Sequence, residues 1–370
     1  MKLSPTVCLC SEVEVLGPLA ERLLTLRASF FDYLDTLPEP YRSTIKQHYI
    51  ERLVRSEDRY MLGEYAPLLL AQLLEIPEED ADGITIPWLL LYECSLLFDD
   101  VVDIKGSCQA EWVLCAQFLY DYCISAWGEW FEQYPALWAK FREYHAQAVT
   151  AAFEEVQRSK NSSPDSLTKM VPEVHVAMGR KAALVKFCAT VLSLQFKRRL
   201  LSVVEEEAID SLCAGIQLLD DLTDSVEDHK SGRDHYGVRL AIERLVRRDG
   251  IGPTDNCLDS DQLTAILVFS GGFSEMARLA EGYLIRGLSA LPTLCDTLAA
   301  RYLRSISDSC RVAAETTDRV LQANVSLIDR MRLSLYKMPP VFSELVEREP
   351  YRNTWRQIIE CVRGLATASN

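Results

Sequence analysis

The sequence predicts an all-α protein built as one domain. Apolar residues recur three and four positions apart along most of the 370 residues, whereas the alternation typical of strands is scarce. No stretch is rich enough in Gly, Ser or Pro to separate two domains. We therefore expect a helical domain over residues 13–335, a tail over 1–12 and a helical extension over 336–370.

Proline, glycine and polar clusters predict where the individual helices end. The first helical segment shows apolar positions Leu16, Leu19, Leu23, Leu24, Leu26, Phe30, Phe31 and Leu34. Later segments are separated at residues 37–40, 76–77, 159–165, 249–253, 271–272 and 339–340. The intervals between these points are long enough for long helices.

The net charge limits the possible partners. The chain has 39 basic and 54 acidic residues, a formal charge of −15, which disfavours nucleic acid or an anionic membrane as a partner. An anionic substrate would need bound divalent metal to invert the local charge.

Cysteine usage and apolar runs predict a cytoplasmic protein. The 12 cysteines are scattered through apolar stretches without a CxxC pair, which indicates buried reduced thiols. The N-terminus lacks the pattern of a signal peptide. The run over 84–98 is interrupted by Glu93, so we expect no stable membrane span.

Two acidic motifs share the spelling Asp-Asp-x-x-Asp, and each follows an apolar stretch. They are Asp99, Asp100 and Asp103, and then Asp220, Asp221 and Asp224, with Gln217 one turn before the second. Residues four apart share a helix face, so each motif forms a stripe of carboxylates. Such like charges destabilise a helix by about 0.2–0.5 kcal/mol per pair, and partly desolvated carboxylates repel unless a cation neutralises them.

Magnesium suits these stripes, because it takes oxygen ligands and completes its shell with water and substrate phosphate. We expect all six aspartates to be metal ligands, with catalysis depending on Asp99, Asp103, Asp220 and Asp224. A solvated acidic face would explain either motif alone, but explains the pair poorly. Basic residues nearby suit the remaining oxygens of a diphosphate, or are surface cations near helix ends: Arg180, Lys181, Lys230 and Arg233.

These residues resemble the trans-isoprenyl diphosphate synthases and the class I terpene synthases that share their helical fold, within the polyprenyl synthetase superfamily. Residues 217–224 resemble the second aspartate motif with its preceding glutamine, 180–184 the lysine-bearing helix, and 228–233 the basic turn that follows. Order and spacing agree over roughly residues 50–250. The resemblance implies a single-domain isoprenoid synthase bundle, three Mg²⁺ ions per site, diphosphate contacts from Gln217 and Lys181, and a homodimer.

Two departures from the chain-elongating members concern their second substrate, isopentenyl diphosphate. Those members carry a Gly-Lys-Arg-x-Arg-Pro-like segment upstream of the first motif, where this chain has Gly63-Glu64-Tyr65-Ala66-Pro67. They also carry an arginine pair after the first motif, whereas no arginine occurs here between Asp103 and Arg142. A second diphosphate needs several fixed cations. The resemblance therefore implies that the allylic site is kept and the isopentenyl site is lost.

That combination is similar to a terpene synthase, a carbon–oxygen lyase acting on phosphates. It implies Mg²⁺-dependent ionisation of an allylic diphosphate (farnesyl, geranylgeranyl or longer), cyclisation or rearrangement of the carbocation, and release of pyrophosphate. By the resemblance, the small Cys94 and Ser95 before the first motif imply a deep pocket with Trp88 as its floor. Aromatic faces could stabilise the cation or be ordinary core: Trp88, Tyr92, Phe98, Phe118 and Tyr122.

Two other functions stay open at this point. One is a prenyltransferase that joins the allylic group to a non-standard acceptor or to isopentenyl diphosphate. The other is a non-catalytic partner subunit of a prenyl synthase, although such a subunit has no need of clustered acids. Chain length, product skeleton and stereochemistry depend on cavity shape, which helical periodicity does not supply.

Overall fold

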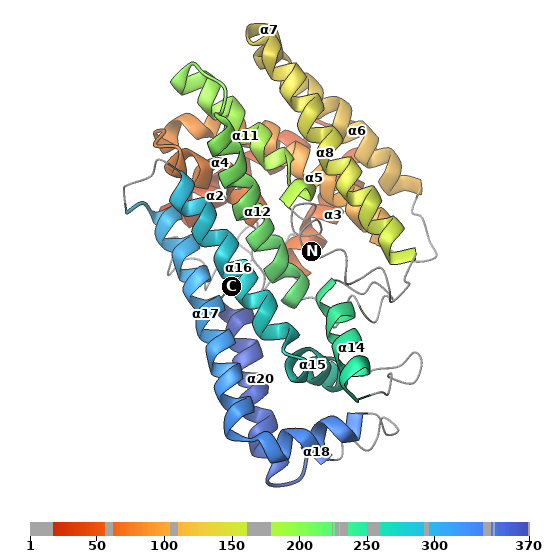
Figure 1. Cartoon of the computed structure of the whole chain (residues 1–370). Coiled ribbons are helices and arrows are strands. Elements are labelled where there is room, and N and C mark those ends of the chain that lie inside the picture. The colour runs from red at the N-terminus through yellow and green to blue at the C-terminus, as the bar shows by residue number, and fades with distance from the viewer. Residues whose placement is uncertain are drawn as a thin grey trace.

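A computed structural model of the chain consists of helices throughout the residues that it describes (Figure 1). The described residues are 18–55, 62–103, 110–160, 179–223, 225, 229, 236–249, 260–291, 296–335, 342 and 345–368. Within them, the strand-poor pattern of the sequence is confirmed.

The first half of the chain supplies seven α-helices and one 3₁₀ turn among the described residues. They are α2 (Pro18–Leu34), α3 (Tyr41–Arg55), α4 (Leu62–Leu73), the 3₁₀ turn η1 (Glu78–Ala81), α5 (Asp82–Asp103), α6 (Ala110–Ala126), α7 (Gly128–Gln133) and α8 (Pro135–Lys160). Proline-containing breaks separate α2 from α3 and α4 from η1, as the sequence predicts.

The second half of the chain continues with further helices. They are α11 (Leu184–Leu192), the π-helical turn η2 (Ser193–Lys197), α12 (Val203–Thr223), α14 (Tyr236–Asp249), α15 (Ser260–Phe269), α16 (Gly272–Ala290), α17 (Leu298–Ala323), α18 (Val325–Leu335) and α20 (Tyr351–Ala368). The predicted break at Gly271 is confirmed, where φ is +78° between α15 and α16.

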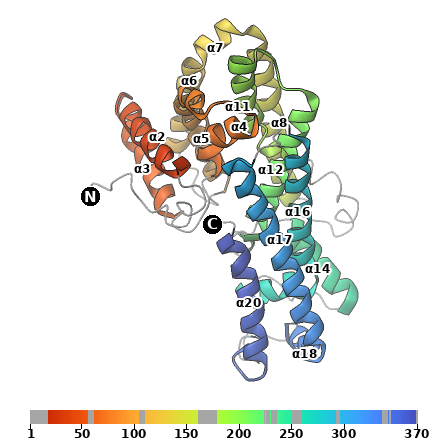
Figure 2. The ribbon, with the colours of Figure 1, turned by 90° about the vertical axis from the view of Figure 1, so that its left-hand side faces the viewer.

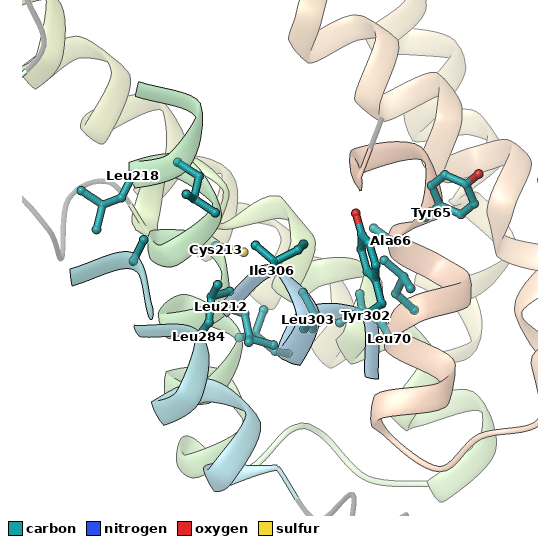
Figure 3. Packing of buried hydrophobic residues seen from close by; sticks show 14 of the residues in the cluster. Tyr65, Ala66, Leu70, Leu212, Cys213, Leu218, Leu284, Tyr302, Leu303 and Ile306 are labelled. Carbon is teal, nitrogen blue, oxygen red and sulfur yellow. The ribbon is translucent and has the colours of Figure 1, made fainter. Parts of the chain in front are cut away.

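The core is one continuous apolar cluster through both halves. Helix α12 packs on α16, α16 on α17, and α17 on α20 and α4. Figure 3 shows Tyr302 of α17 beside Ala66 and Leu70 of α4, with Leu212 of α12 near Leu284 of α16. Burial of these side chains fixes the position of α4 and α12 in the bundle.

Helix α11 lies at the centre of the part that carries the acidic motifs. It contacts α4, α5, α8 and α12 (Figure 2). Helix α5 packs mainly against α6 and also against α4 and α2, and α3 packs against α6. The first motif, at the end of α5, and the second, at the end of α12, are therefore carried by neighbours of α11.

Side-chain caps fix the start of two of these helices. Ser202 and Glu205 form a capping box at α12: the Ser202 amide donates to Glu205 Oε2 at 2.8 Å, and the Glu205 amide donates to Ser202 Oγ at 3.3 Å. At α17, the Ala299 amide donates to the buried Gln72 Oε1 of α4 at 2.7 Å. Capping by another helix ties α17 to α4.

The described cysteines are free thiols, and Cys94, Cys115, Cys123, Cys188, Cys213 and Cys310 are buried, as expected. Among the described helices, no single one is long and apolar enough to cross a membrane; α15 and α16, bent by 70°, meet that test only as a pair.

Candidate active site

Helix α5 turns one face toward α4, and that face carries the first aspartate of the motif. Trp88, Tyr92, Ser95 and Asp99 fall on one side of the helix by their spacing. The Trp88 indole donates from Nε1 to the Gly63 carbonyl of α4 at 2.6 Å and stacks with Tyr92 at 6.2 Å between ring centroids. A Cβ at Gly63 would overlap the Tyr92 ring, so only glycine permits this close approach.

The aspartates of the first motif differ in their surroundings. Asp99 is exposed, whereas Asp100 is partly buried and turns toward α3, where its Oδ2 lies 2.8 Å from Nε2 of His48. Asp103 is the last residue of α5. The aspartates of the first motif therefore have different surroundings, although they belong to one sequence motif.

A buried polar network starts at Asp100 and runs through α5, α3, α4 and α2. His48 Nδ1 lies 2.6 Å from Glu93 Oε1, and Arg52 donates to Glu93 Oε2 at 2.9 Å. Arg52 also donates to Glu64 Oε1 at 3.1 Å, and Arg27 donates to Glu64 Oε2 at 2.5 Å. We call Arg27, His48, Arg52, Glu64 and Glu93 the buried charge network.

Burial and charge act against each other in this network. Burial alone lowers the pKa of His48, but its bonds to Asp100 and Glu93 and their charges raise that pKa to about 9. Burial likewise opposes the charge of Arg52, and the carboxylates of Glu93 and Glu64 outweigh it and raise the pKa of the guanidinium. The cations are thus held charged by the network's own carboxylates.

The second motif is organised by Gln217. Its Nε2 lies 3.3 Å from Asp220 Oδ2 and 3.2 Å from Asp221 Oδ1. Asp220 is exposed and Asp221 is buried. Gln217, expected at the diphosphate, is thus a hydrogen-bond donor to both neighbouring carboxylates of its own helix.

Tyr92 links the two motifs in space. Burial is the main cause that raises its pKa to about 12, and the charge of Asp220 contributes in the same direction. Tyr92 of α5 therefore lies within electrostatic range of Asp220 on α12.

The lysine-bearing segment lies against α12. A Cβ at Gly179 would stand 2.6 Å from the Asp210 carbonyl, so this segment approaches the α12 backbone closely. Arg180 is exposed and Lys181 is half-buried. Below them, the buried Lys186 of α11 binds Asp210 of α12 at 2.8 Å and fixes the pairing of the two helices.

The side chains expected to line a cavity fall into two groups. Trp88, Tyr92 and Ser95 share the Asp99 face. Cys94 instead faces α6, with Sγ 3.3 Å from the Ala116 carbonyl. Phe118 stacks on Tyr41 of α3 at 4.1 Å and packs against Tyr122, while Phe98 is 40% exposed. Cys94 and Phe118 thus contact α6 and α3, respectively.

The side chains present indicate which metal ion the site could hold. Within the described ranges, no three His, Cys, Asp or Glu side chains converge on one point. Asp99 and Asp220 offer carboxylate oxygens, which suit a hard cation that takes its other ligands from substrate phosphate. Asp224, Lys230 and Arg233, and the side chain of Asp103, lie outside what the structure describes.

Sequence reasoning missed the buried charge network. Its signal was Glu93, an acid that interrupts the apolar run over 84–98. A charge within a buried helix face requires a buried partner, but periodicity does not say that α3 supplies it.

One solved structure has a fold similar to that of this chain. The geranylgeranyl pyrophosphate synthetase from the archaeon Geoglobus acetivorans superposes with a TM-score of 0.60 at 16% identity, covering 79% of this chain and 99% of that one. No protein-family model and no curated protein matches the chain. The chain has the all-α isoprenoid synthase fold.

Proposed function

We propose that this chain is a Mg²⁺-dependent enzyme acting on an allylic isoprenoid diphosphate, and that it works as a terpene synthase. The fold and the oxygen donors of the two aspartate motifs support the general class. The aspartates of both motifs would hold the metal: Asp99, Asp100, Asp103, Asp220, Asp221 and Asp224. Lys181, Arg180, Lys230 and Arg233 would face the remaining diphosphate oxygens.

Bound Mg²⁺ would supply the positive charge that makes diphosphate a leaving group. The chain's own residues would keep the resulting carbocation away from water. Trp88 is 2% exposed and packs as core, so of this stacked pair the partly buried Tyr92 would offer the aromatic surface. One side of Tyr92 is already occupied, because the Arg52 guanidinium lies 5.4 Å from its ring centroid.

The observation that favours a terpene synthase is the pairing of two buried arginines, Arg27 and Arg52, with carboxylates of α4 and α5. Where the resemblance expects bases for isopentenyl diphosphate, Glu64 is 0% exposed and is paired with Arg27 and Arg52. Arg52 is paired with Glu93 as well. Diverting these arginines to a second diphosphate would leave carboxylates buried without partners, at about 3–5 kcal/mol for a broken buried pair.

Product analysis tests this proposal. Geranyl, farnesyl, geranylgeranyl and geranylfarnesyl diphosphates are each incubated with the protein and Mg²⁺, and products are identified by mass spectrometry. We expect pyrophosphate and a hydrocarbon or alcohol from one of them. Asp99→Ala and Asp220→Ala should abolish turnover, and full activity in both variants would contradict the metal site.

A prenyltransferase is the second candidate, because the similar structure is a geranylgeranyl pyrophosphate synthetase. It predicts no turnover of a single allylic diphosphate. Addition of labelled isopentenyl diphosphate, or of an aromatic acceptor, would then yield a product that carries both units.

A further inference from the structure

His48 reaches two acids that lie two turns apart on one side of α5. Its ring nitrogens stand 2.6 Å from Glu93 Oε1 and 2.8 Å from Asp100 Oδ2. The side chain is 1% exposed, and the ring of Trp112 packs against it edge-on at 5.2 Å between centroids. A ring rotation that gave up either bond would leave a buried polar atom unpaired, so the ring has one favoured orientation.

Glu93 is itself held from its other oxygen by Arg52, and Arg52 by Glu64. The orientation of His48 is thus determined by helices α3, α4 and α5 together. Of the two carboxylates that contact the His48 ring, Asp100 is 33% exposed and belongs to the first motif, whereas Glu93 is 0% exposed.

We propose that His48 is a positioning residue, which fixes the carboxylate of Asp100 and thereby orders the first acidic motif to bind metal and diphosphate. This inference rests on the proposed function. Partners that hydrogen-bond a ligating carboxylate orient it, and losing one weakens metal affinity or activity by about 10- to 100-fold.

A matched pair of substitutions separates positioning from general stability. In His48→Gln the amide nitrogen can reach the place of Nε2 and still donate to Asp100. In His48→Asn it can reach only the place of Nδ1 and donate to Glu93. His145→Asn on α8 is the control, because this half-buried histidine packs against Phe141 and Tyr120, away from the acidic motifs.

The measurement is Mn²⁺ binding in the presence of inorganic pyrophosphate, followed by electron paramagnetic resonance of the free ion. We expect His48→Asn to raise the Mn²⁺ dissociation constant about 10- to 100-fold. His48→Gln should bind more tightly than His48→Asn, and His145→Asn as the wild type. Equal binding by His48→Asn and wild type, or equal losses in both His48 variants, would overturn the positioning role.

A turnover assay adds a second readout. In His48→Asn the Mg²⁺ concentration for half-maximal rate should rise while kcat at saturating Mg²⁺ largely recovers, which a general packing defect would not produce. If His48→Asn does not fold, Asp100→Asn replaces it: it should weaken Mn²⁺ binding to the same degree, and unchanged binding overturns the inference. A wild type that binds no Mn²⁺ with pyrophosphate overturns the proposed function as well, whereas normal wild-type binding with an unaffected His48→Asn overturns the inference alone.

Discussion

Replacing Glu64 by Gln tests whether the buried charge network holds the first motif's surroundings together. Glu64 is 0% exposed, and its main partner Arg27 is 1% exposed, so water cannot replace the lost charge. Arg52 keeps Glu93 as a partner, and the new amide oxygen can still accept one bond. We therefore expect the low end of the range for a broken buried pair, about 3 kcal/mol.

With an unfolding entropy of about 2.1 cal/mol/K per residue over 370 residues, that loss lowers Tm by about 4 °C. Urea unfolding at pH 7 measures the free energy directly. Asp35→Asn is the control: its ion pair with Lys46 is exposed at the aspartate, and its removal should change stability by less than about 1 kcal/mol. If Glu64→Gln unfolds at the same urea concentration as this control, the network does not stabilise the fold and the reasoning fails.

Two further predictions concern the supports of the site. The hydrogen bonds from Arg199, against the opposing effect of burial, lower the pKa of Glu205 from 4.5 to about 2, so its stabilisation is present above pH 4.5 and is lost as pH falls toward 2. Glu205→Gln should lower the free energy of unfolding by about 1 kcal/mol at neutral pH and reduce its fall between pH 4.5 and 2, as measured by urea unfolding at several pH values. An unchanged pH dependence in this variant would contradict the prediction. Gly63→Ala should cost about 1–3 kcal/mol because its Cβ meets the Tyr92 ring, whereas Gly83→Ala, with open space, should cost nothing; equal denaturation midpoints would refute the close approach.

The fold could be predicted because its signals are local. Helical periodicity depends on neighbours three and four positions apart, and proline or glycine ends a helix where it stands, as at residues 37–40 and Gly271. Packing of α12 on α16, and of α17 on α4, joins residues far apart in the chain. No local pattern specifies such pairs.

In the candidate site, the sequence predicts which residues share a face of one helix, but not which other helix that face contacts. Spacing places Asp99 with Tyr92 on one face, and Asp220 beside Gln217. It does not separate Asp99 from Asp100, whose surroundings differ because α3 brings His48 to one of them. The same limit applies to Cys94, which faces α6 although it adjoins Ser95 in sequence.

Glu64 illustrates both the strength and the limit of the sequence. An acid where the chain-elongating synthases that the sequence resembles carry a base predicts that a second-substrate site is absent. The arginines that pair with Glu64, Arg27 and Arg52, come from helices α2 and α3. Charge complementarity across three helices is a property of packing, and it needed the structure.

The proposed function requires that one diphosphate is ionised without a second being condensed. Pyrophosphate release from the preferred allylic diphosphate, with Mg²⁺, measures this directly when isopentenyl diphosphate is added or left out. We expect equal release in both cases, with no product extended by an isoprene unit. Release that depends on isopentenyl diphosphate, with an elongated product, would contradict the account.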